Sequence, residues 1–516
     1  MPVADRTTGA TALPAPSRLT VVLTAAMIAL LSGCAAGPDF QRPAPPTVAD
    51  YDHRPPATTV ATADVAGGQA QRFIADRDIP ADWWTLFGSK PLDALVAQAL
   101  QHNPDLQAAQ AALRQAHENT LAQRGAYAPM VSAGITASRQ QDPPGALAAV
   151  PSNNAFLYNL RTPQLSVSYA PDVFGRNRRT VESLQAQEQA SRYQMLAAQL
   201  TLATNVVAAA VQEASLRTQL DATGKIIAAD QRMLAIVQYR ASKGVASGLD
   251  LAAQQSQLAQ AQASLPALQT QLAQQRHALA VLTGQLPAQA ADVDFDLDAL
   301  TLPQDLPLSL PSQLVRQRPD ILQAQANLHA ANAQLGVAIA NRFPTFQITA
   351  NAGHTALSWA SLFADGTGFW SVASGLTATI FDAGQLRHQQ RAAQAGVEQA
   401  AAQYRSTVLA AFQNVADTLS ALEQDANALQ AAAAATQAAG RTLDLTQRQA
   451  QSGYTDEMAV LTAQQAFEQA RIGLAQTRAS RYADTAALYQ ALGGGWWQHA
   501  DHLTSMTDRQ AHPDAR

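Results

Sequence analysis

Residues 251–279 read LAAQQSQLAQAQASLPALQTQLAQQRHAL. A leucine recurs at every seventh position of this stretch, and the series is Leu251, Leu258, Leu265, Leu272 and Leu279. A seven-residue apolar repeat is typical of helices that pack side by side in a coiled coil. Pro266 lies inside the series and is expected to bend or loosen it locally. The stretch therefore predicts a long helix that packs along its length against another helix.

A still longer helix is predicted just before this stretch. Residues 176–242 contain no proline, and a helix of about 65 residues is about 100 Å long at 1.5 Å per residue. Gly244 follows it as the expected turn before a helix over 249–282. Helices over 384–451 and 456–492 repeat the arrangement around Gly453, with a further heptad series at Val408, Val415, Leu422 and Leu429. Such lengths indicate a coiled-coil tube rather than a globular domain.

The two helix pairs belong to an internal repeat. Asn103-Pro104-Asp105 matches Arg318-Pro319-Asp320 at a spacing of 215 residues, and Gly244 matches Gly453 at a spacing of 209. Each copy has the same predicted order: a helix (about 91–124 in the first copy and 312–341 in the second), two strands, a very long helix and a further helix. A period of about 210 residues indicates the duplication of a domain-sized unit.

Two strand hairpins are predicted, over about 127–174 and 343–381. Their strands are 10–15 residues long and partly alternating, as in Leu165-Ser166-Val167-Ser168-Tyr169. Strands of this length can cross a bilayer at a tilt, but four strands alone leave two unpaired edges in lipid. Two chains would close eight strands around a filled interior, whereas three would close 12 around a lumen. The trimer is the favoured prediction, and a soluble hairpin domain stays as an alternative.

The N-terminus predicts export. Arg6 and Arg18 precede an apolar run over 19–31, which at about 20 Å is too short to span a bilayer core of about 30 Å. Leu31-Ser32-Gly33-Cys34 then places small residues before the single cysteine of the chain. This pattern predicts a signal peptide over 1–33, and an ordinary signal peptide with a chance cysteine is the alternative. No other stretch is expected to form a transmembrane helix.

Composition and motifs argue against several classes of protein. The net charge is −5 and charged residues make up 14% of the chain, so no basic surface indicates a nucleic-acid partner. The ten histidines show no ligand spacing, and a lone cysteine excludes both an intramolecular disulfide and a cysteine cluster for a metal. No nucleophile, base and acid arrangement is apparent. We therefore expect no enzyme, no metal site and no cofactor.

The predicted organisation follows from these signals. In order, the segments are a signal peptide (1–33), an extended N-terminal arm (34–88), repeat 1 (89–286), an equatorial linker (287–311), repeat 2 (312–495) and a flexible C-terminal tail (496–516).

Several stretches resemble the TolC-like outer-membrane factor family, in its lipoprotein branch of NodT-type and OprM-like efflux channels. The matching stretches include Leu31 to Cys34, Asn103 to Leu106, Asp172 to Arg176, Phe381 to Gly384 and Leu488 to Trp496. The resemblance implies a mainly α fold with membrane β, in which a trimeric 12-stranded β-barrel in the outer membrane continues as a periplasmic α-helical barrel. It also implies cleavage before Cys34 and an N-acyl diglyceride and palmitate on that residue.

The same resemblance implies a function. The expected protein is a passive exit duct for small molecules such as drugs, which works with a periplasmic adaptor and an inner-membrane pump of the resistance-nodulation-division type. A type I secretion duct, a periplasmic coiled-coil adaptor and a structural or enzymatic lipoprotein are the alternatives. Adaptors have a single helical hairpin, whereas this chain predicts two.

In this family the gate lies near the two helix turns, here 243–250 and 452–462. Asp250 matches a pore-facing carboxylate, and Met458 matches a hydrophobic constriction residue. Two positions that are often acidic in the family are occupied by Ala459 and Thr462 in this chain, which puts an acidic ring in doubt. Asp456 can supply charge nearby. The simpler interpretations are a helix-capping role for Asp250 and ordinary packing for Met458.

Overall fold

The computed structural model describes residues 35–48, 50–51, 58–141, 157–289 and 295–499. The chain forms two compact units, which are described separately. The strand unit comprises 1–41, 117–186 and 329–399, and the hairpin unit comprises 42–116, 187–328 and 400–516. Each unit contains segments from both sequence repeats. The compact units therefore do not coincide with the two repeats, because each repeat contributes to both.

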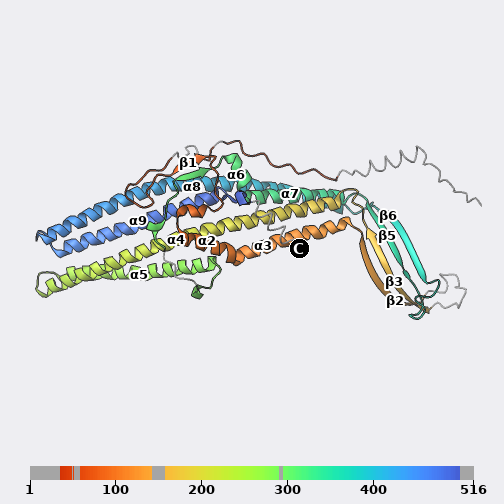
Figure 1. Ribbon diagram of the computed structural model, residues 1–516, viewed down its shortest axis with the longest axis horizontal. Coiled ribbons are helices and arrows are strands. Elements are labelled where there is room, and N and C mark those ends of the chain that lie inside the picture. The colour runs from red at the N-terminus through yellow and green to blue at the C-terminus, as the bar shows by residue number, and fades with distance from the viewer. Residues whose placement is uncertain (1–34, 49, 52–57, 142–156, 290–294, 500–516) are drawn as a thin grey trace, which may run out of the picture. The chain divides into compact units, whose positions relative to one another are not determined.

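A four-stranded antiparallel sheet forms the core of the strand unit (Figure 1). Its strands, in spatial order, are β2 (Met130–Gln141), β3 (Leu157–Tyr169), β5 (Thr345–His354) and β6 (Gly368–Thr377). β3 and β5 come from different repeats and pair over Gln164–Tyr169. Within the described residues, β2 and β6 have no second neighbouring strand. Both edges therefore present backbone donors and acceptors to a further strand.

The sheet has one apolar and one polar face, as its register shows. Residues paired across neighbouring strands lie on the same face. One row across all four strands is apolar, namely Val131, Val167, Ala350 and Val372. The next row, on the opposite face, is polar, namely Ser132, Ser166, Asn351 and Ser371. The exposed Ile135, Leu165 and Trp370 extend the apolar face. The two faces of the sheet therefore differ in polarity.

Aspartates cap the long helices where they follow the strands. Both carboxylate oxygens of Asp172 accept backbone N–H groups at the start of α4 (Arg176–Ser242), from Asn177 at 2.8 Å and Arg178 at 2.7 Å. Asp382 does the same for α8 (Gln385–Gln451), through the N–H groups of Gly384 and Leu386, both at 2.8 Å. These caps satisfy donors that a helix N-terminus leaves unpaired. The corners of the two repeats are therefore chemically equivalent.

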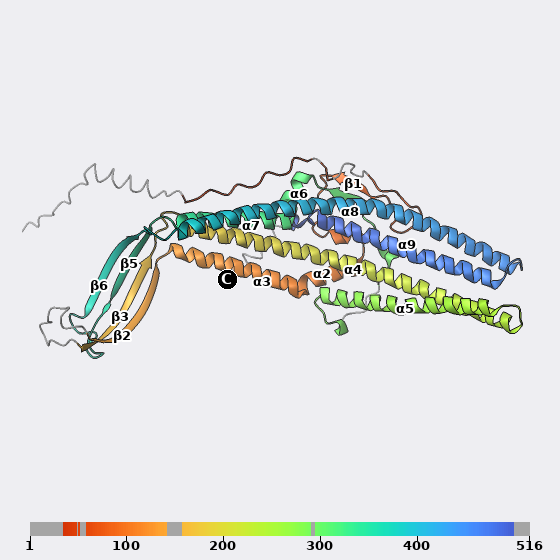
Figure 2. The ribbon, with the colours of Figure 1, turned by 180° about the vertical axis from the view of Figure 1, so that it is seen from behind.

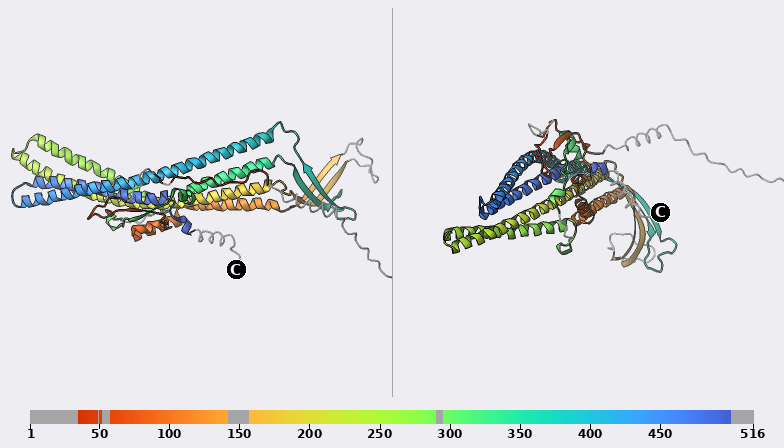
Figure 3. Two further views of the ribbon diagram at one scale, coloured as in Figure 1. Left: turned by 90° about the horizontal axis from the view of Figure 1, so that it is seen from above. Right: turned by 60° about the vertical axis from the view of Figure 1, so that its left-hand side comes forward.

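Two long helical hairpins form much of the hairpin unit (Figure 2). α4 pairs with α5 (Gly248–Leu282), and α8 pairs with α9 (Glu457–Ala491). α4 and α8 have 67 residues each, and α5 and α9 have 35 each. Each hairpin closes in a short turn, as the view from above in Figure 3 also shows. The heptad leucines of α5 are less exposed than most of their neighbours, and Pro266 lies within a helix that continues past it.

The expected helices over about 91–124 and 312–341 are each broken in two. α2 (Lys90–His102) gives way to α3 (Pro104–Arg124), and α6 (Pro311–Gln317) gives way to α7 (Pro319–Ala340). Asn103 and Arg318 have extended backbones, with ψ of 124° and 122°. A residue that precedes proline is disfavoured in the helical region, and proline then starts the new helix. The continuous helices of the sequence-based expectation were therefore wrong at these two points.

The N-terminal arm and the linker contain structure that the sequence did not reveal. β1 (Arg72–Ala75) pairs in parallel with β4 (Asp305–Leu308), and Trp83 and Phe87 are fully buried. The arm thus pairs with the linker at residues 72–75 and joins the hairpin unit's core at Trp83 and Phe87. The C-terminal tail is likewise ordered over Trp496–His499, where the Trp496 Nε1 donates to the Gln317 carbonyl at 2.7 Å. Residues 500–516 lie outside the described ranges.

One described helix, α4, contains a stretch that is long and apolar enough to cross a membrane. However, 56% of that stretch is buried inside the protein, as in the core helix of a folded domain. Val206, Val207 and Val211 are examples, each at most 1% exposed. Packing against other helices therefore accounts for its apolar character.

Candidate functional site at the helical turns

The two hairpin turns have the same backbone geometry. Gly244 and Gly453 have φ of +73° and +76°, and a Cβ atom at either position would meet nothing within 4 Å. The N–H groups of Val245 and Tyr454 donate to the carbonyls of Arg240 and Gln449, each at 2.9 Å. This is the hydrogen bond of a Schellman helix end. Glycine is thus required at both turns by backbone conformation and not by lack of space.

Asp250 caps the helix to which it belongs. Its Oδ2 accepts from the Ser247 N–H at 2.9 Å and from the Ser247 hydroxyl at 2.8 Å, while that hydroxyl oxygen accepts from the Asp250 N–H. These bonds form a capping box at the start of α5. Hydrogen bonding from the Ser247 backbone holds the pKa of Asp250 below its usual value. Within one chain, the side chain of Asp250 is therefore engaged in local helix capping.

An ion pair joins the two hairpins close to their turns. Arg240, in the last turn of α4, places its Nη2 2.7 Å from the Oδ2 of Asp456, the N-cap residue of α9. The Arg240 Nη1 lies 3.4 Å from the Met458 sulfur. Both charged side chains are partly exposed, at 39% and 48%. An exposed pair of this kind stabilises by about 0.2–1 kcal/mol. We call these three residues the tip clasp.

Apolar packing supports the tip clasp about two helical turns further along α4. Met233 and Leu461 are each 2% exposed and form a small core with Ala229. The Thr462 hydroxyl donates to the Met458 carbonyl at 2.8 Å and lies 3.8 Å from the Met233 sulfur. The contact between α4 and α9 thus changes from charged to apolar over about two helical turns.

A buried carboxylate lies next to this small core, one residue after Ala229 on α4. Asp230 on α4 is 1% exposed, and it accepts Nε2 donors from Gln254 of α5 at 3.1 Å and from Gln465 of α9. Its Oδ2 has no hydrogen-bond partner among the described residues. Burial raises the pKa of Asp230, although both amides favour its charged form. One carboxyl group therefore joins three helices without an ion-pair partner in the part of the chain that the structure describes, which makes it costly to keep charged.

Comparison with known proteins identifies the family. The profile described as "Outer membrane efflux protein" matches residues 95–285 and 310–494, which is most of the chain and includes both turns and both hairpins. The chain belongs to the outer membrane efflux protein family. It is therefore the outer-membrane channel component of a tripartite efflux system, and it is not an enzyme. Its channel extends from the outer membrane into the periplasm.

Relatives of this efflux channel cover nearly all of its length. The pyoverdine export outer membrane protein OpmQ of Pseudomonas putida is 31% identical over 86% of this chain and 94% of its own length. The toluene efflux pump outer membrane protein TtgC of the same species is 30% identical over 93% and 96%.

Solved channel structures share the fold of this efflux channel. The outer-membrane channel OprN matches with a TM-score of 0.74 at 27% identity, over 90% of this chain and 100% of that one. The Campylobacter jejuni channel CmeC matches with a TM-score of 0.78 at 21% identity, over 92% and 98%. The fold predicted from sequence, a helical barrel with membrane strands, is confirmed by these similarities.

The structure brings together three of the four predicted gate residues of the efflux channel. Asp456, Met458 and Thr462 all contact the C-terminal part of α4, whereas Asp250 bonds to its own helix. Sequence reasoning missed Arg240 and Asp230. Arg240 lies four residues before Gly244, and a basic residue in a final helical turn was a usable signal. Asp230 gave no signal, because its burial depends on two helices distant in sequence.

Two further predictions concern lipid and metal. Cys34 lies outside the described residues, so its acylation stays a prediction. Among the residues that the structure does describe, no group of three or more His, Cys, Asp or Glu side chains is placed to hold a metal ion.

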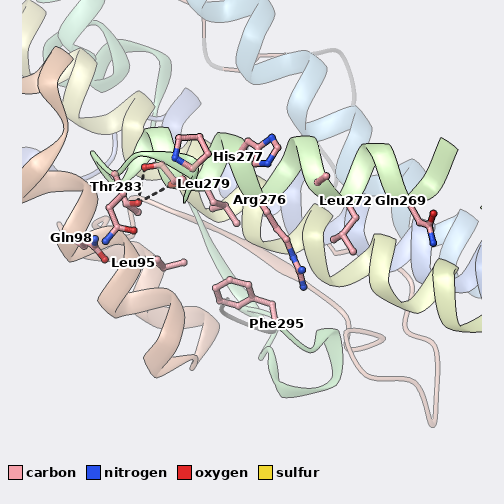
Figure 4. A pocket seen from close by; sticks show the side chains of 13 residues that line it. Leu95, Gln98, Gln269, Leu272, Arg276, His277, Leu279, Thr283 and Phe295 are labelled. Carbon is pink, nitrogen blue, oxygen red and sulfur yellow. Dashed lines mark hydrogen bonds between the residues drawn. The ribbon is translucent and has the colours of Figure 1, made fainter. Parts of the chain in front are cut away.

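A cavity of about 490 Å³ lies in the hairpin unit (Figure 4), and no residue of the tip clasp lines it. Leu95 of α2, Leu272 and Leu279 of α5 and Phe295 give it apolar walls. The Arg276 Nε donates across to the buried Glu213 of α4 at 3.2 Å. Since this arginine neutralises a carboxylate that is fully buried, its visible role is to secure α5 on α4.

Proposed function

We propose that the efflux channel works as a homotrimeric, passive exit duct whose helical end is held closed by the tip clasp. The observation that carries the proposal is the sheet with alternating apolar and polar rows and two open edges. A sheet with these faces suits a barrel wall between lipid and a water-filled lumen. Backbone groups at the edges must be paired in lipid, so neighbouring chains supply the missing strands.

Three copies fit this requirement best. Four strands per chain give 12 strands for a trimer, enough to leave an aqueous lumen, whereas eight leave room only for side chains. Each sheet would use β2 as one contact edge and β6 as the other. A ring of three head-to-tail contacts then closes without a free edge.

The gate would open by separation of the two hairpins of each chain. At the tip, α9 is held to α4 by one partly exposed ion pair, a small apolar core and the hydrogen bond from Gln465 to Asp230, so opening there costs little free energy. Cargo would pass without any chemical step. The relatives are named for pyoverdine export and toluene efflux, which supports small organic molecules as the class of cargo.

The remaining parts of the proposal concern partners and the anchor. An adaptor and an inner-membrane pump of the resistance-nodulation-division type would dock at the helical end. An N-acyl diglyceride on Cys34 would tether each chain in addition to its strands, because several acyl chains bind membranes durably.

Single-channel recording in planar bilayers tests the duct. We expect low, rare conductance for the unaltered protein and sustained conductance for Arg240→Ala with Asp456→Ala. Heat-modifiable trimer bands in outer-membrane fractions test the assembly, and radioactive palmitate tests Cys34. Absence of conductance in the double variant, despite intact trimers in the membrane, would contradict a duct closed by the tip clasp.

A further inference from the structure

The segment over 35–41, which we call the N-terminal strap, lies in the strand unit against α4 and α7. It has no regular secondary structure, and side chains of the two helices hold it in place. α4 belongs to the first repeat and α7 to the second. The strap is therefore a short peptide laid across a contact between the two repeats.

Arg179 of α4 binds the strap at three atoms. Its side chain is 4% exposed, and its Nε donates to the Ala36 carbonyl at 3.1 Å. Its Nη2 donates to the Gly37 carbonyl at 3.1 Å and to the Asp39 carboxylate at 2.8 Å. The Nη1 pairs with Glu182 at 2.7 Å, so the buried guanidinium is charge-compensated. Loss of the strap would remove two carbonyls and one carboxylate from a buried cation.

α7 contributes the other side of the seat. The Asn332 Nδ2 donates to the Pro38 carbonyl at 3.0 Å. The ring of Phe40 stacks on His329 with centroids 4.3 Å apart, and the His329 Nε2 lies 2.9 Å from Glu182. Polar and aromatic contacts thus alternate along the strap, and both helices hold it.

Glycines allow the strap to come this close. Gly37 has a φ of +92°, and a Cβ there would lie 2.8 Å from the Cα of Gly336 on α7. A Cβ on Gly336 would lie 2.9 Å from the Arg179 side chain. At Gly175, a Cβ would lie 2.8 Å from Ala35, next to the bond from the Ala36 N–H to the Phe174 carbonyl. The seat is shaped for this peptide at three separate points.

We infer that the N-terminal strap is an internal ligand whose seat on α4 and α7 fixes the point that Ala35 occupies. That point is the corner at which the chain passes from β3 to α4, since Ala35 packs on Gly175. If Cys34 carries lipid, as proposed above, the seat positions that lipid beside the base of the membrane strands. Arg179 is then a positioning residue for the anchor, and it acts through the strap.

Chemical crosslinking tests the seat. In a Phe40→Cys and His329→Cys protein, a short bis-methanethiosulfonate linker should join the two positions in most chains purified from outer membranes, as read by mass spectrometry of the linked peptides. Adding Arg179→Met should lower the linked fraction at least fivefold. Arg176→Met removes an exposed arginine from the same helix end and should leave the fraction unchanged. Equal linking in both arginine variants, or little linking in the parent, would overturn the inference.

A second variant covers the case in which Arg179→Met fails to fold. Gly336→Ala improves helix propensity, so a structural role confined to the helix predicts no loss. The seat predicts at least a threefold loss of linking, because the new methyl group meets the Arg179 side chain that binds the strap; an unchanged fraction would count against it. Palmitate incorporation is measured on the same samples. Linking without palmitate would reject the anchor but keep the seat, and palmitate without linking would do the reverse.

Discussion

The carboxyl group of Asp425 on α8 lies within hydrogen-bonding reach of that of Asp484 on α9. Burial, together with the neighbouring carboxyl, raises the pKa of Asp425 to about 7, against the attraction of Arg481. Arg481 is itself 1% exposed and bonds to Gln71, Thr59 and the Gln69 carbonyl. The contact between the two helices of the second hairpin therefore favours the protonated form of Asp425.

This contact predicts a loss of stability as pH rises. The pKa in the folded chain lies above the 3.8 of an ordinary Asp, so folding favours the protonated form. The stabilisation is complete below about pH 4 and is lost as pH passes through about 7. Asp425→Asn should gain about 1 kcal/mol at pH 8, after allowance for solvent screening. Thermal unfolding between pH 5 and 8 checks this, and a variant with the same pH slope as the parent would contradict it.

The tip clasp predicts a leak. Arg240→Ala and Asp456→Asn should each raise channel open probability, and the double variant should add little to either, because both remove one interaction. The coupling energy is expected to be about 0.2–1 kcal/mol. Arg448→Ala is the matched control, since Arg448 pairs with Asp444 within α8 alone. Fully additive effects in bilayer recordings would show that the two side chains do not act together.

Asp230 predicts that removal of a charge strengthens the tip. Burial raises its pKa, so its contribution to stability is lost as pH rises. Asp230→Asn retains the size of the side chain and both hydrogen-bonding neighbours but removes the buried charge. We expect a higher thermal midpoint at pH 8 and fewer openings, whereas Asp230→Ala should lower the midpoint by leaving the two glutamines unpaired. Opposite signs for Asn and Ala are the result to look for, and equal losses would disprove the account.

Replacement of glycine by alanine is expected to have opposite effects at a hairpin turn and inside a helix. Gly244→Ala forces a Cβ into a left-handed conformation and should cost about 1–2 kcal/mol. Gly224→Ala lies within α4 in open space and should stabilise by about 0.5–1 kcal/mol. Thermal unfolding of the two variants side by side gives the measurement. A gain at Gly244 would mean that its turn is not under conformational constraint.

The long helices were predictable because their signals are local and numerous. Heptad leucines, a proline-free run and glycine stops placed α4 and α5 within one residue of their observed bounds. The strand ends were less well placed, because a strand's bounds depend on which neighbour it pairs with. β3 ends at Tyr169, five residues before the predicted end, since Pro171 soon follows and a proline cannot donate to a strand ladder.

The interior contacts of the site were not predictable in the same way. Arg179 and Asp230 are single charged residues on helices that read as solvated, and their burial is created by segments about 140 and 235 residues away. No local pattern carries that information. The N-terminal arm misled for the same reason: its proline-rich beginning predicted an extended chain, yet Trp83 stacks on Tyr489 at 5.2 Å.

The equal lengths of the paired helices limit how the gene can change. α4 and α8 both have 67 residues, and α5 and α9 both have 35. If the two turns must lie side by side to share one gate, a deletion in one hairpin would leave its turn short of the other turn. Insertions and deletions should then be tolerated only as matched events in four helices at once. Among natural variants, this part of the protein is expected to vary in residue identity while its helix lengths change together or not at all.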